Sequence, residues 1–309
     1  MAAPGAERLA RAYFALQAAG SVVWWILVFA TTPIREATLG GLDPALVAAL
    51  DVPLFVAASA LAAALPLRIA RGSATVATVW TLIVTVLLGL YATLSTQAGA
   101  GVIIMIAASG GSIGAWCFLT WGRVPTAWLL VGPFAFRRAR RRRTPTAHIV
   151  ATAGQIVVFW GLFLVVLPAV IRTLELRWRV ALDLPAGIVV AGAALVVAAS
   201  ALGVWSAAAL TVEGDGTPLP SAMPNRLVVA GPYRLVRNPM AVAGIAQGVG
   251  VGMLLSSWMV VAYALIGSLI WNYAIRPHEE ADLASAFGDD YRAYARRVRC
   301  WLPRLRAPR

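Results

Sequence analysis

The sequence contains no lysine, so arginine supplies all of its permanent positive charge. Charged residues make up only 13% of the 309 residues, whereas soluble domains carry about a quarter. Acidic residues are especially scarce, 13 against 26 basic ones, which leaves a formal charge of +13. Cysteine and histidine occur twice each, as Cys117, Cys300, His148 and His278. These numbers exclude a disulfide framework, and the spacings are not those of a metal site.

Long apolar runs take the place of the missing charge, because 60% of the residues are hydrophobic and the mean hydropathy is +0.78. A membrane span needs about 20 apolar residues. We interpret the first run as a retained span, since no clear cleavage site follows it. The sequence predicts an all-α polytopic membrane protein with about eight transmembrane helices, at 12–31, 46–66, 74–94, 101–121, 147–170, 186–210, 239–255 and 257–275.

The arginines cluster before the first run and after each even-numbered run, which predicts that both termini are cytoplasmic. The loop at 211–238 and the C-terminal tail should share that side. Only the loop at 171–184 departs from the pattern. The arginine run at 137–143 is interpreted as a topology anchor that touches anionic membrane lipids, in preference to a nucleic-acid patch. We therefore expect a multi-pass protein of the cell (inner or plasma) membrane without a nucleic-acid partner.

The same arginine run, with Thr144 and Pro145, predicts a boundary between a four-span region at 1–145 and a second region at 146–309. The first region shows no recognisable chemistry. Its one acid within a run, Asp51, is interpreted as lying at the outer interface near Asp43 and Arg35, although an acid within a span is a functional candidate by default.

The chemistry is expected after position 210. The stretch 214–238 is long and rich in glycine and proline, which is typical of a functional loop. The short run after it has glycines every fourth residue, at Gly244, Gly248 and Gly252, which favours close helix packing over cofactor contact. The tail then predicts an amphipathic interfacial helix that begins near Pro277 and is interrupted at Gly288. Arg276 and Glu280 share one face of it, or simply mark the helix start. We expect Trp301, beyond this helix, to be an interfacial anchor.

Three motifs follow in order: G-x-G-T-P-x-P, then L-V-x-x-G-P-Y-R-x-V-R-N-P-M, then H-E-E-x-x-L-x-x-x-F-G-x-x-Y-x-x-Y-x-x-x-V-x-x-W-L-P-R. Over residues 211–304 the chain resembles the isoprenylcysteine carboxyl methyltransferase and phospholipid methyltransferase group of integral-membrane enzymes. The resemblance implies an all-helical fold and methylation with S-adenosylmethionine, bound on the cytoplasmic side without a metal. Residues before 211 lie outside it.

Carried over by position, the resemblance implies two catalytic residues, Arg276 and Glu280. The cofactor-binding residues that it implies are Gly231, Tyr233, Arg237, Asn238, Pro239, His278, Glu279, Glu280, Tyr291 and Tyr294. A guanidinium suits the carboxylate of the cofactor, glutamates suit its ammonium and ribose hydroxyls, and tyrosine rings suit its sulfonium.

Two departures from the family pattern concern the acceptor. Asn238 stands where many relatives have histidine, and Ala241 stands where relatives usually have tyrosine. The acceptor is expected to be lipophilic: an isoprenylcysteine-like carboxylate, a phospholipid amine, or a small hydrophobic acid or thiol. An amine would need a base, such as His278 or a glutamate. A small-molecule transporter and a degenerate, non-catalytic family member are the alternatives. The sequence leaves the oligomeric state open.

Overall fold

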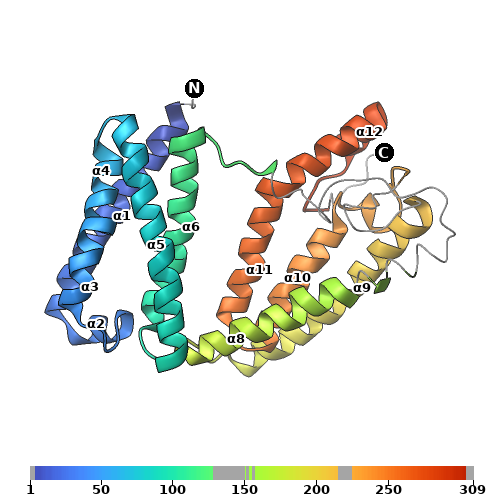
Figure 1. The fold of residues 1–309 in the computed structure, drawn as a ribbon. Helices are drawn as coiled ribbons and strands as arrows, with labels where there is room; N and C mark the ends of the chain where they lie inside the picture. Colours follow the sequence, from blue (N-terminus) through green and yellow to red (C-terminus); the bar gives the residue numbers. More distant parts are fainter. Residues whose placement is uncertain (1–3, 128–149, 151–152, 155–156, 215–224, 304–309) are drawn as a thin grey trace. The chain divides into compact units, whose positions relative to one another are not determined.

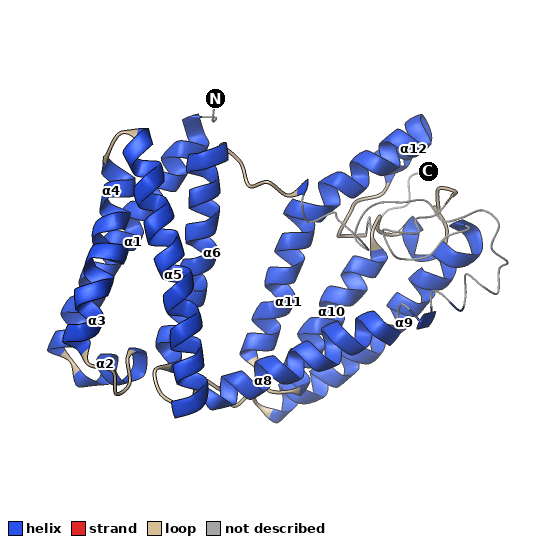
Figure 2. Ribbon diagram, in the orientation of Figure 1, coloured by secondary structure: helices blue, strands red, loops and turns tan. Residues whose placement is uncertain are grey.

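The structure is a computed structural model that describes residues 4–127, 150, 153–154, 157–214 and 225–303. These residues form helices and connecting loops, with no strand among them (Figure 2). The chain divides into two compact units. Unit 1 comprises Met1–Pro125 with Leu174–Ala181, and unit 2 comprises Thr126–Thr173 with Leu182–Arg309. The boundary expected at 145/146, the arginine run at 137–143 and most of the G-x-G-T-P-x-P motif lie outside the described residues.

Unit 1 is a bundle of apolar helices (Figure 1). It contains α1 (Pro4–Ala30), α2 (Thr32–Thr38), α3 (Pro44–Asp51), the π-helix η1 (Val52–Ala57), α4 (Ala58–Ala64), α5 (Leu67–Ser95) and α6 (Gly99–Trp121). Phe14 and Leu119 are buried among alanines of α4, α5 and α6 in its main core. Small alanines let the helix backbones approach closely, as in other membrane bundles.

Arginine side chains complete two helix ends in unit 1. Arg11 donates from Nη1 to the backbone oxygens of Ala63, at 3.0 Å, and Leu65, at 2.8 Å. Arg71 donates from Nε to the backbone oxygen of Leu119 at 2.8 Å. The last carbonyls of a helix have no partner within it, so these guanidinium groups satisfy acceptors that would otherwise be exposed at the membrane boundary.

The surroundings of Asp51 differ from those expected. Its side chain is buried, with 6% of the residue exposed, and it accepts hydrogen bonds from the indoles of Trp25 and Trp80. Asp43 caps the start of α3, and Arg35 donates to a threonine one turn before it. The partners of Asp51 are therefore two indoles and not Asp43 or Arg35, and its place at the membrane interface stays a prediction. Proximity in sequence suggested those neighbours, whereas helix packing supplies two indoles from distant positions.

Unit 2 contains the π-helix η4 (Gly161–Val166), most of α8 (Leu167–Arg177), α9 (Ala186–Gly214), α10 (Pro239–Leu254) and α11 (Trp258–Ile270). Glycines bring α10 close to both neighbours. A Cβ at Gly250 would lie 2.8 Å from Val196 of α9, and one at Gly248 would lie 2.8 Å from Ala264 of α11. Gly252 similarly faces α11, whereas a Cβ at Gly244 would meet nothing within 4 Å. Close packing thus accounts for Gly248 and Gly252 of the predicted face.

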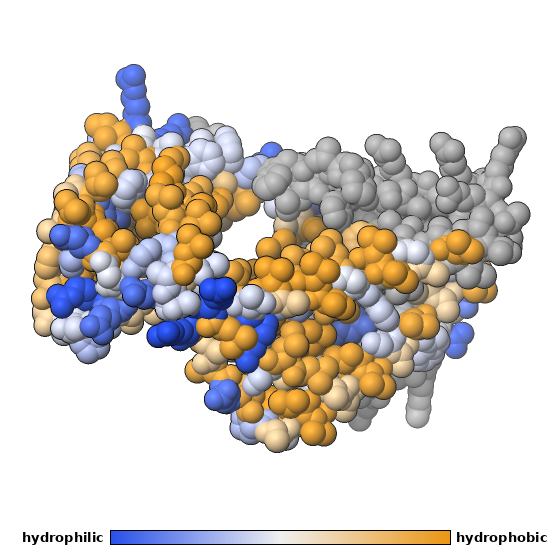
Figure 3. Space-filling view, turned by 60° about the horizontal axis from the view of Figure 1, so that its bottom comes forward, coloured by the Kyte–Doolittle hydropathy of each residue, from blue (hydrophilic) through white to orange (hydrophobic). Residues whose placement is uncertain are grey.

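Seven helices in the described part of the chain are long and apolar enough to cross a membrane. Each predicted run has a corresponding helix, but Pro239–Leu254 is shorter than a full span. The fifth helix ends at Arg177, later than the predicted end at residue 170. Large apolar side chains are exposed on the flanks of the helices in both units (Figure 3), as lipid-facing surfaces require.

The last membrane helix continues into the tail without a loop. The π-helix η7 (Trp271–Ile275) joins α11 to α12 (Arg276–Arg297). The apolar part ends at Ile275, and the charged sequence of α12 places this helix beyond the span. Gly288 interrupts α12 with φ 56° and ψ −126°, which confirms the predicted break. The buried Tyr291 and the bond from Tyr294 to the backbone of Tyr233 follow this kink, so the second half of α12 packs against other parts of unit 2.

Candidate active site

The first wall of the candidate site is a short 3₁₀ turn, η6 (Gly231–Arg234), before α10. Gly231 has φ +55°, and a Cβ there would lie 3.3 Å from Nε1 of Trp205 on α9. Glycine is therefore required for both the backbone conformation and the close approach. The turn buries Tyr233 to 7% exposure, and burial, followed by the charge of Glu279, raises the pKa of its hydroxyl.

Asn238 links the start of α10 to the start of α12. Its Oδ1 accepts from the backbone N–H of Ala241 at 3.0 Å, so Asn238 is the N-cap of α10. Its Nδ2 donates to Oε2 of Glu279 at 3.4 Å. The buried Pro239 occupies the start of the helix, where its missing N–H costs nothing. An asparagine at position 238 thus suits capping, whereas it supplies no base.

Two arginines converge on one carboxylate. Nη2 of Arg237 lies 3.0 Å from Oε1 of Glu280, and Nη1 of Arg276 lies 3.7 Å from the same oxygen. These side chains are between 18% and 31% exposed. Among the described residues, the buried Nε of Arg237 has no hydrogen-bond acceptor. One carboxylate therefore faces two guanidinium groups, and the cluster retains a donor that can receive an anionic ligand.

The start of α12 adds a second acid to this cluster. The pKa of Glu279 is raised to about 7. Burial is the largest cause, and the charges of Glu280 and Asp282 come next. Three causes acting in one direction hold this carboxyl between its neutral and ionised forms near neutral pH. Glu279 can therefore take up or release a proton under ordinary conditions, as an acid or base in a reaction must.

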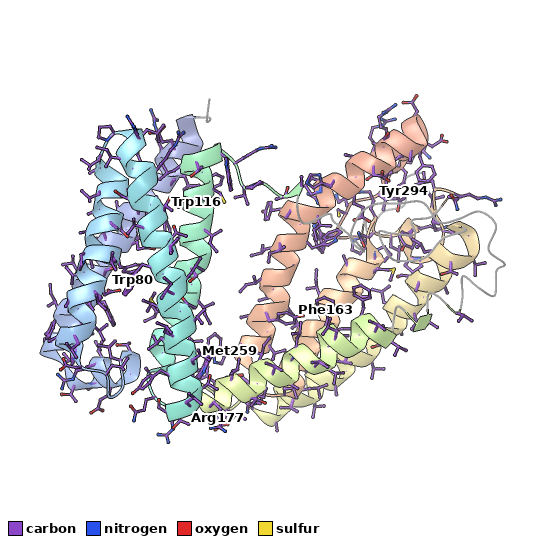
Figure 4. The ribbon with its side chains drawn as sticks, viewed as in Figure 1. Trp80, Trp116, Phe163, Arg177, Met259 and Tyr294 are labelled. Carbon is purple, nitrogen blue, oxygen red and sulfur yellow. The ribbon has the colours of Figure 1, made fainter. Side chains whose placement is uncertain are left out.

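Tyrosines line the cluster. The ring centroids of Tyr291 and Tyr294 lie 6.4 Å apart, and the hydroxyl of Tyr294 donates to the backbone oxygen of Tyr233 at 2.7 Å. Burial, then the charge of Glu280, raises the pKa of Tyr291 to about 12, so its ring stays neutral. Tyr294, labelled on α12 in Figure 4, thus ties this helix to the 3₁₀ turn.

The segment after α12 returns to the site. The backbone N–H of Arg237 donates to the backbone oxygen of Arg299 at 2.9 Å. Nε1 of Trp301 donates to Oδ1 of Asn272 at 2.9 Å, and its ring packs edge-to-face on Trp271 at 5.3 Å. Trp301 is therefore fixed to η7 and to its neighbouring ring. The expectation of a simple interfacial anchor missed this role.

Most of the predicted residues come together in this cluster through hydrogen bonds, ion pairs or direct charge interaction: Tyr233, Arg237, Asn238, Arg276, Glu279, Glu280, Tyr291 and Tyr294. Gly231 and Pro239 shape the backbone around it. His278 has a different partner, because its Nε2 lies 2.9 Å from Oγ1 of Thr126. The geometry shows how these residues are placed, and their roles toward a cofactor stay predictions.

Sequence reasoning missed several neighbours of the cluster. Cys300 is buried, and burial raises the pKa of its thiol, beside the guanidinium of Arg276. Asn272 and Trp205 also contact site elements, at η7 and at Gly231. The W-L-P signature at 301–303 offered a signal for Trp301. Asn272 and Trp205 sit in apolar runs with no local signal, so only the fold reveals them. No group of acids, histidines and cysteines in the described residues could hold a metal ion.

Together, the fold and the cluster define an all-helical membrane protein with a charged, aromatic-lined site just beyond the ends of two membrane helices. Residues 188–290, from α9 into α12, match the family model described as phospholipid methyltransferase. This match confirms the family resemblance over that segment and supports a membrane methyltransferase.

A curated relative is the cobalt-zinc-cadmium resistance protein CzcN of Cupriavidus metallidurans, 36% identical over 81 residues. The aligned segment covers 26% of this chain and 37% of the relative, so the chain spans little more than a third of it. No solved structure matches the chain.

Proposed function

We propose that unit 2 transfers a methyl group from S-adenosylmethionine to a lipophilic acceptor at the cytoplasmic face of the cell membrane. The observation that carries the proposal is the pairing of two arginines, Arg237 and Arg276, with one carboxylate beside a second, titratable acid. The family match over residues 188–290 supports it independently. When bound, the cofactor supplies an electrophilic methyl group on a sulfonium.

The residues present fit such a cofactor. Arg237 has a buried Nε without an acceptor in the described part of the chain, and a ligand carboxylate could accept from it. Glu279 and Glu280 can accept from an ammonium or from ribose hydroxyls. The neutral rings of Tyr291 and Tyr294 offer π faces to a sulfonium. Methyl transfer is an in-line displacement, so these groups act mainly by positioning both reactants.

Glu279 is the better candidate for a base if the acceptor is an amine. Asn238 has no basic form near neutral pH, and the ring nitrogen of His278 already faces Thr126. The pKa of about 7 lets Glu279 accept the proton that an ammonium acceptor must lose. A carboxylate or thiolate acceptor needs no base, and Arg276, at the end of the membrane helix, could orient it. The acceptor classes predicted from the sequence therefore all stay in the proposal.

Calorimetric titration of S-adenosylmethionine into the detergent-purified full chain tests the proposal, beside an Arg237→Ala variant. A hydrogen-bonded charge contact contributes about 1.5–3 kcal/mol, so we expect affinity to fall at least about tenfold in the variant. Arg292→Ala is the matched control, because Arg292 lies on α12 but is 55% exposed and pairs with Asp289.

Binding by wild type and by Arg292→Ala, with loss in Arg237→Ala, supports the proposed site. Transfer of labelled methyl to membrane lipid extracts then separates an active enzyme from a family member that only binds. Absence of binding by folded wild-type protein refutes the enzyme and leaves the transporter to be tested.

A further inference from the structure

Unit 1 contains a buried carboxylate that the proposed methyl transfer does not use. Oδ2 of Asp51 accepts from Nε1 of Trp25 at 2.9 Å, and Oδ1 accepts from Nε1 of Trp80 at 2.8 Å. Trp80 is labelled on α5 in Figure 4. An indole N–H is a donor only, so both carboxylate oxygens are placed as acceptors. Both forms of the carboxyl can accept two N–H bonds, and the ionised form keeps its remaining lone pairs free for a cation.

The carboxylate lies within a membrane-length helix. The turn after α4 ends at Leu65, whose backbone oxygen is held by Arg11. Asp51 precedes Leu65 by 14 residues and Trp80 follows it by 15, so both lie about 20 Å from that turn at 1.5 Å per residue. The hydrocarbon core of a bilayer is about 30 Å thick. Asp51 therefore lies within the predicted span, about 10 Å from its opposite end.

Three arginines of unit 1 have side-chain partners other than Asp51. Arg11 pairs with Glu7, Arg35 donates to a threonine hydroxyl, and Arg71 donates to a helix carbonyl. Among the described residues, Asp51 has no ion-pair partner within 4 Å. An ionised carboxyl in an apolar medium is costly unless a cation compensates it. A bound cation would therefore favour the ionised form of Asp51.

An apolar groove of about 590 Å³ runs beside the carboxylate, lined by Val22, Trp25, Ile26, Phe29, Ala30, Val52 and Val56. Val52 follows Asp51 directly, and Trp25 both lines the groove and donates to the carboxylate. The π-helix η1 forms its other side, and such widened turns occur often at functional sites. Ile26 and Phe29 are more than half exposed, so the groove opens toward lipid.

We propose that unit 1 binds a protonated lipophilic amine, with its ammonium on Asp51 and its hydrocarbon body in the groove. Each carboxylate oxygen accepts one indole N–H and keeps a second lone pair for an ammonium N–H. The ring of Trp25 both lines the groove and donates to the carboxylate, so its face can attract the cation while its N–H stays bonded to Asp51. The site belongs to unit 1 and is independent of the proposed methyl transfer.

The test uses the full chain in lipid nanodiscs with radiolabelled dodecylamine as the probe and dodecanol as its neutral counterpart. We expect saturable binding of the amine that falls at least tenfold in Asp51→Asn, while weak partitioning of the alcohol is the same in both proteins. Asp43→Asn is the matched control, because Asp43 only caps α3 and asparagine caps equally well. Equal amine binding by wild type and Asp51→Asn overturns the proposal, as does saturable alcohol binding of the same affinity.

A second measurement needs no variant and remains decisive if Asp51→Asn does not fold. Dicyclohexylcarbodiimide reacts with carboxyl groups in apolar surroundings, and mass spectrometry locates the adduct. We expect dodecylamine to slow modification of Asp51 at least fivefold while dodecanol leaves the rate unchanged. Modification at an unaltered rate in saturating dodecylamine refutes the site, and so does equal protection by the alcohol.

Discussion

The titration of Glu279 makes a sharp prediction about stability. Its pKa rises from 4.5 to about 7 in the folded protein, with burial as the main cause. Each pKa unit corresponds to about 1.36 kcal/mol, so ionised Glu279 destabilises the fold by about 3 kcal/mol at most. Glu279→Gln removes this charge while retaining an oxygen that can accept from Asn238. The variant should therefore be more stable than wild type wherever the wild-type carboxyl is ionised.

The sign follows from proton binding in the two states. Between pH 4.5 and about 7 the unfolded chain has released the proton of Glu279, whereas the folded protein still holds it. The contribution of Glu279 to the unfolding free energy therefore falls as pH rises through this window and is constant above about pH 8. The two proteins should have equal stability at pH 4 and diverge toward pH 8.

Thermal unfolding in detergent, followed by intrinsic fluorescence at pH 4.5 to 8, measures this difference. We expect Glu279→Gln to unfold about 5 °C above wild type at pH 8 and at the same temperature at pH 4.5. Asp290→Asn is the matched control, since Asp290 is an exposed acid on the same helix. A stability difference between Glu279→Gln and wild type that does not change with pH would refute the argument. Such a difference would come from side-chain shape and not from the charge of Glu279.

Further predictions follow from the same geometry. Binding of S-adenosylmethionine should release a proton from Glu279 near pH 6.5, so its calorimetric enthalpy should vary with buffer ionisation enthalpy in wild type but not in Glu279→Gln. Gly288→Ala should lower the unfolding free energy by about 1–3 kcal/mol in denaturant titration, because φ 56° and ψ −126° suit only glycine. Tyr294→Phe should cost about 1 kcal/mol in the same assay by removing its bond to the backbone oxygen of Tyr233. Gly250→Ala should cost about 1–3 kcal/mol through the 2.8 Å clash with α9, whereas Gly244→Ala, with open space, should be tolerated.

Periodicity and composition were enough to predict the helices, and the motifs over residues 211–304 carried the family resemblance. Long apolar runs leave few alternatives to membrane helices, since every backbone polar group in lipid must be satisfied within the chain. The pairing of Arg276 with Glu280 was also predictable, because residues four apart on a helix face each other. The motif assigned Arg237 to the same site, whereas its ion pair with Glu280 appears only in the structure. Apolar runs, helical spacing and motifs can all be recognised from the sequence alone.

Contacts between distant helices leave no such signal. The indoles of Trp25 and Trp80 reach Asp51 from 26 residues before and 29 residues after it. The three residues lie on three different helices, α1, α3 and α5, so no helical repeat links them in the sequence. The same holds for Trp301 and Asn272, which are 29 residues apart. In each case packing decides which polar group inside an apolar run receives a partner, and that packing depends on the whole unit.

At the junction between α11 and α12, the sequence predicts that the helix is disturbed but not which backbone geometry results. Proline has no N–H for the preceding turn and crowds it, so Pro277 predicts a disturbance there. The structure resolves it with η7, in which the backbone N–H of Arg276 reaches the oxygen of Trp271, five residues back. A π turn rotates everything after it relative to an α-helix. The direction in which Arg276 and Glu280 face is therefore set by this turn, and counting α-helical positions from α11 would place them on the wrong side.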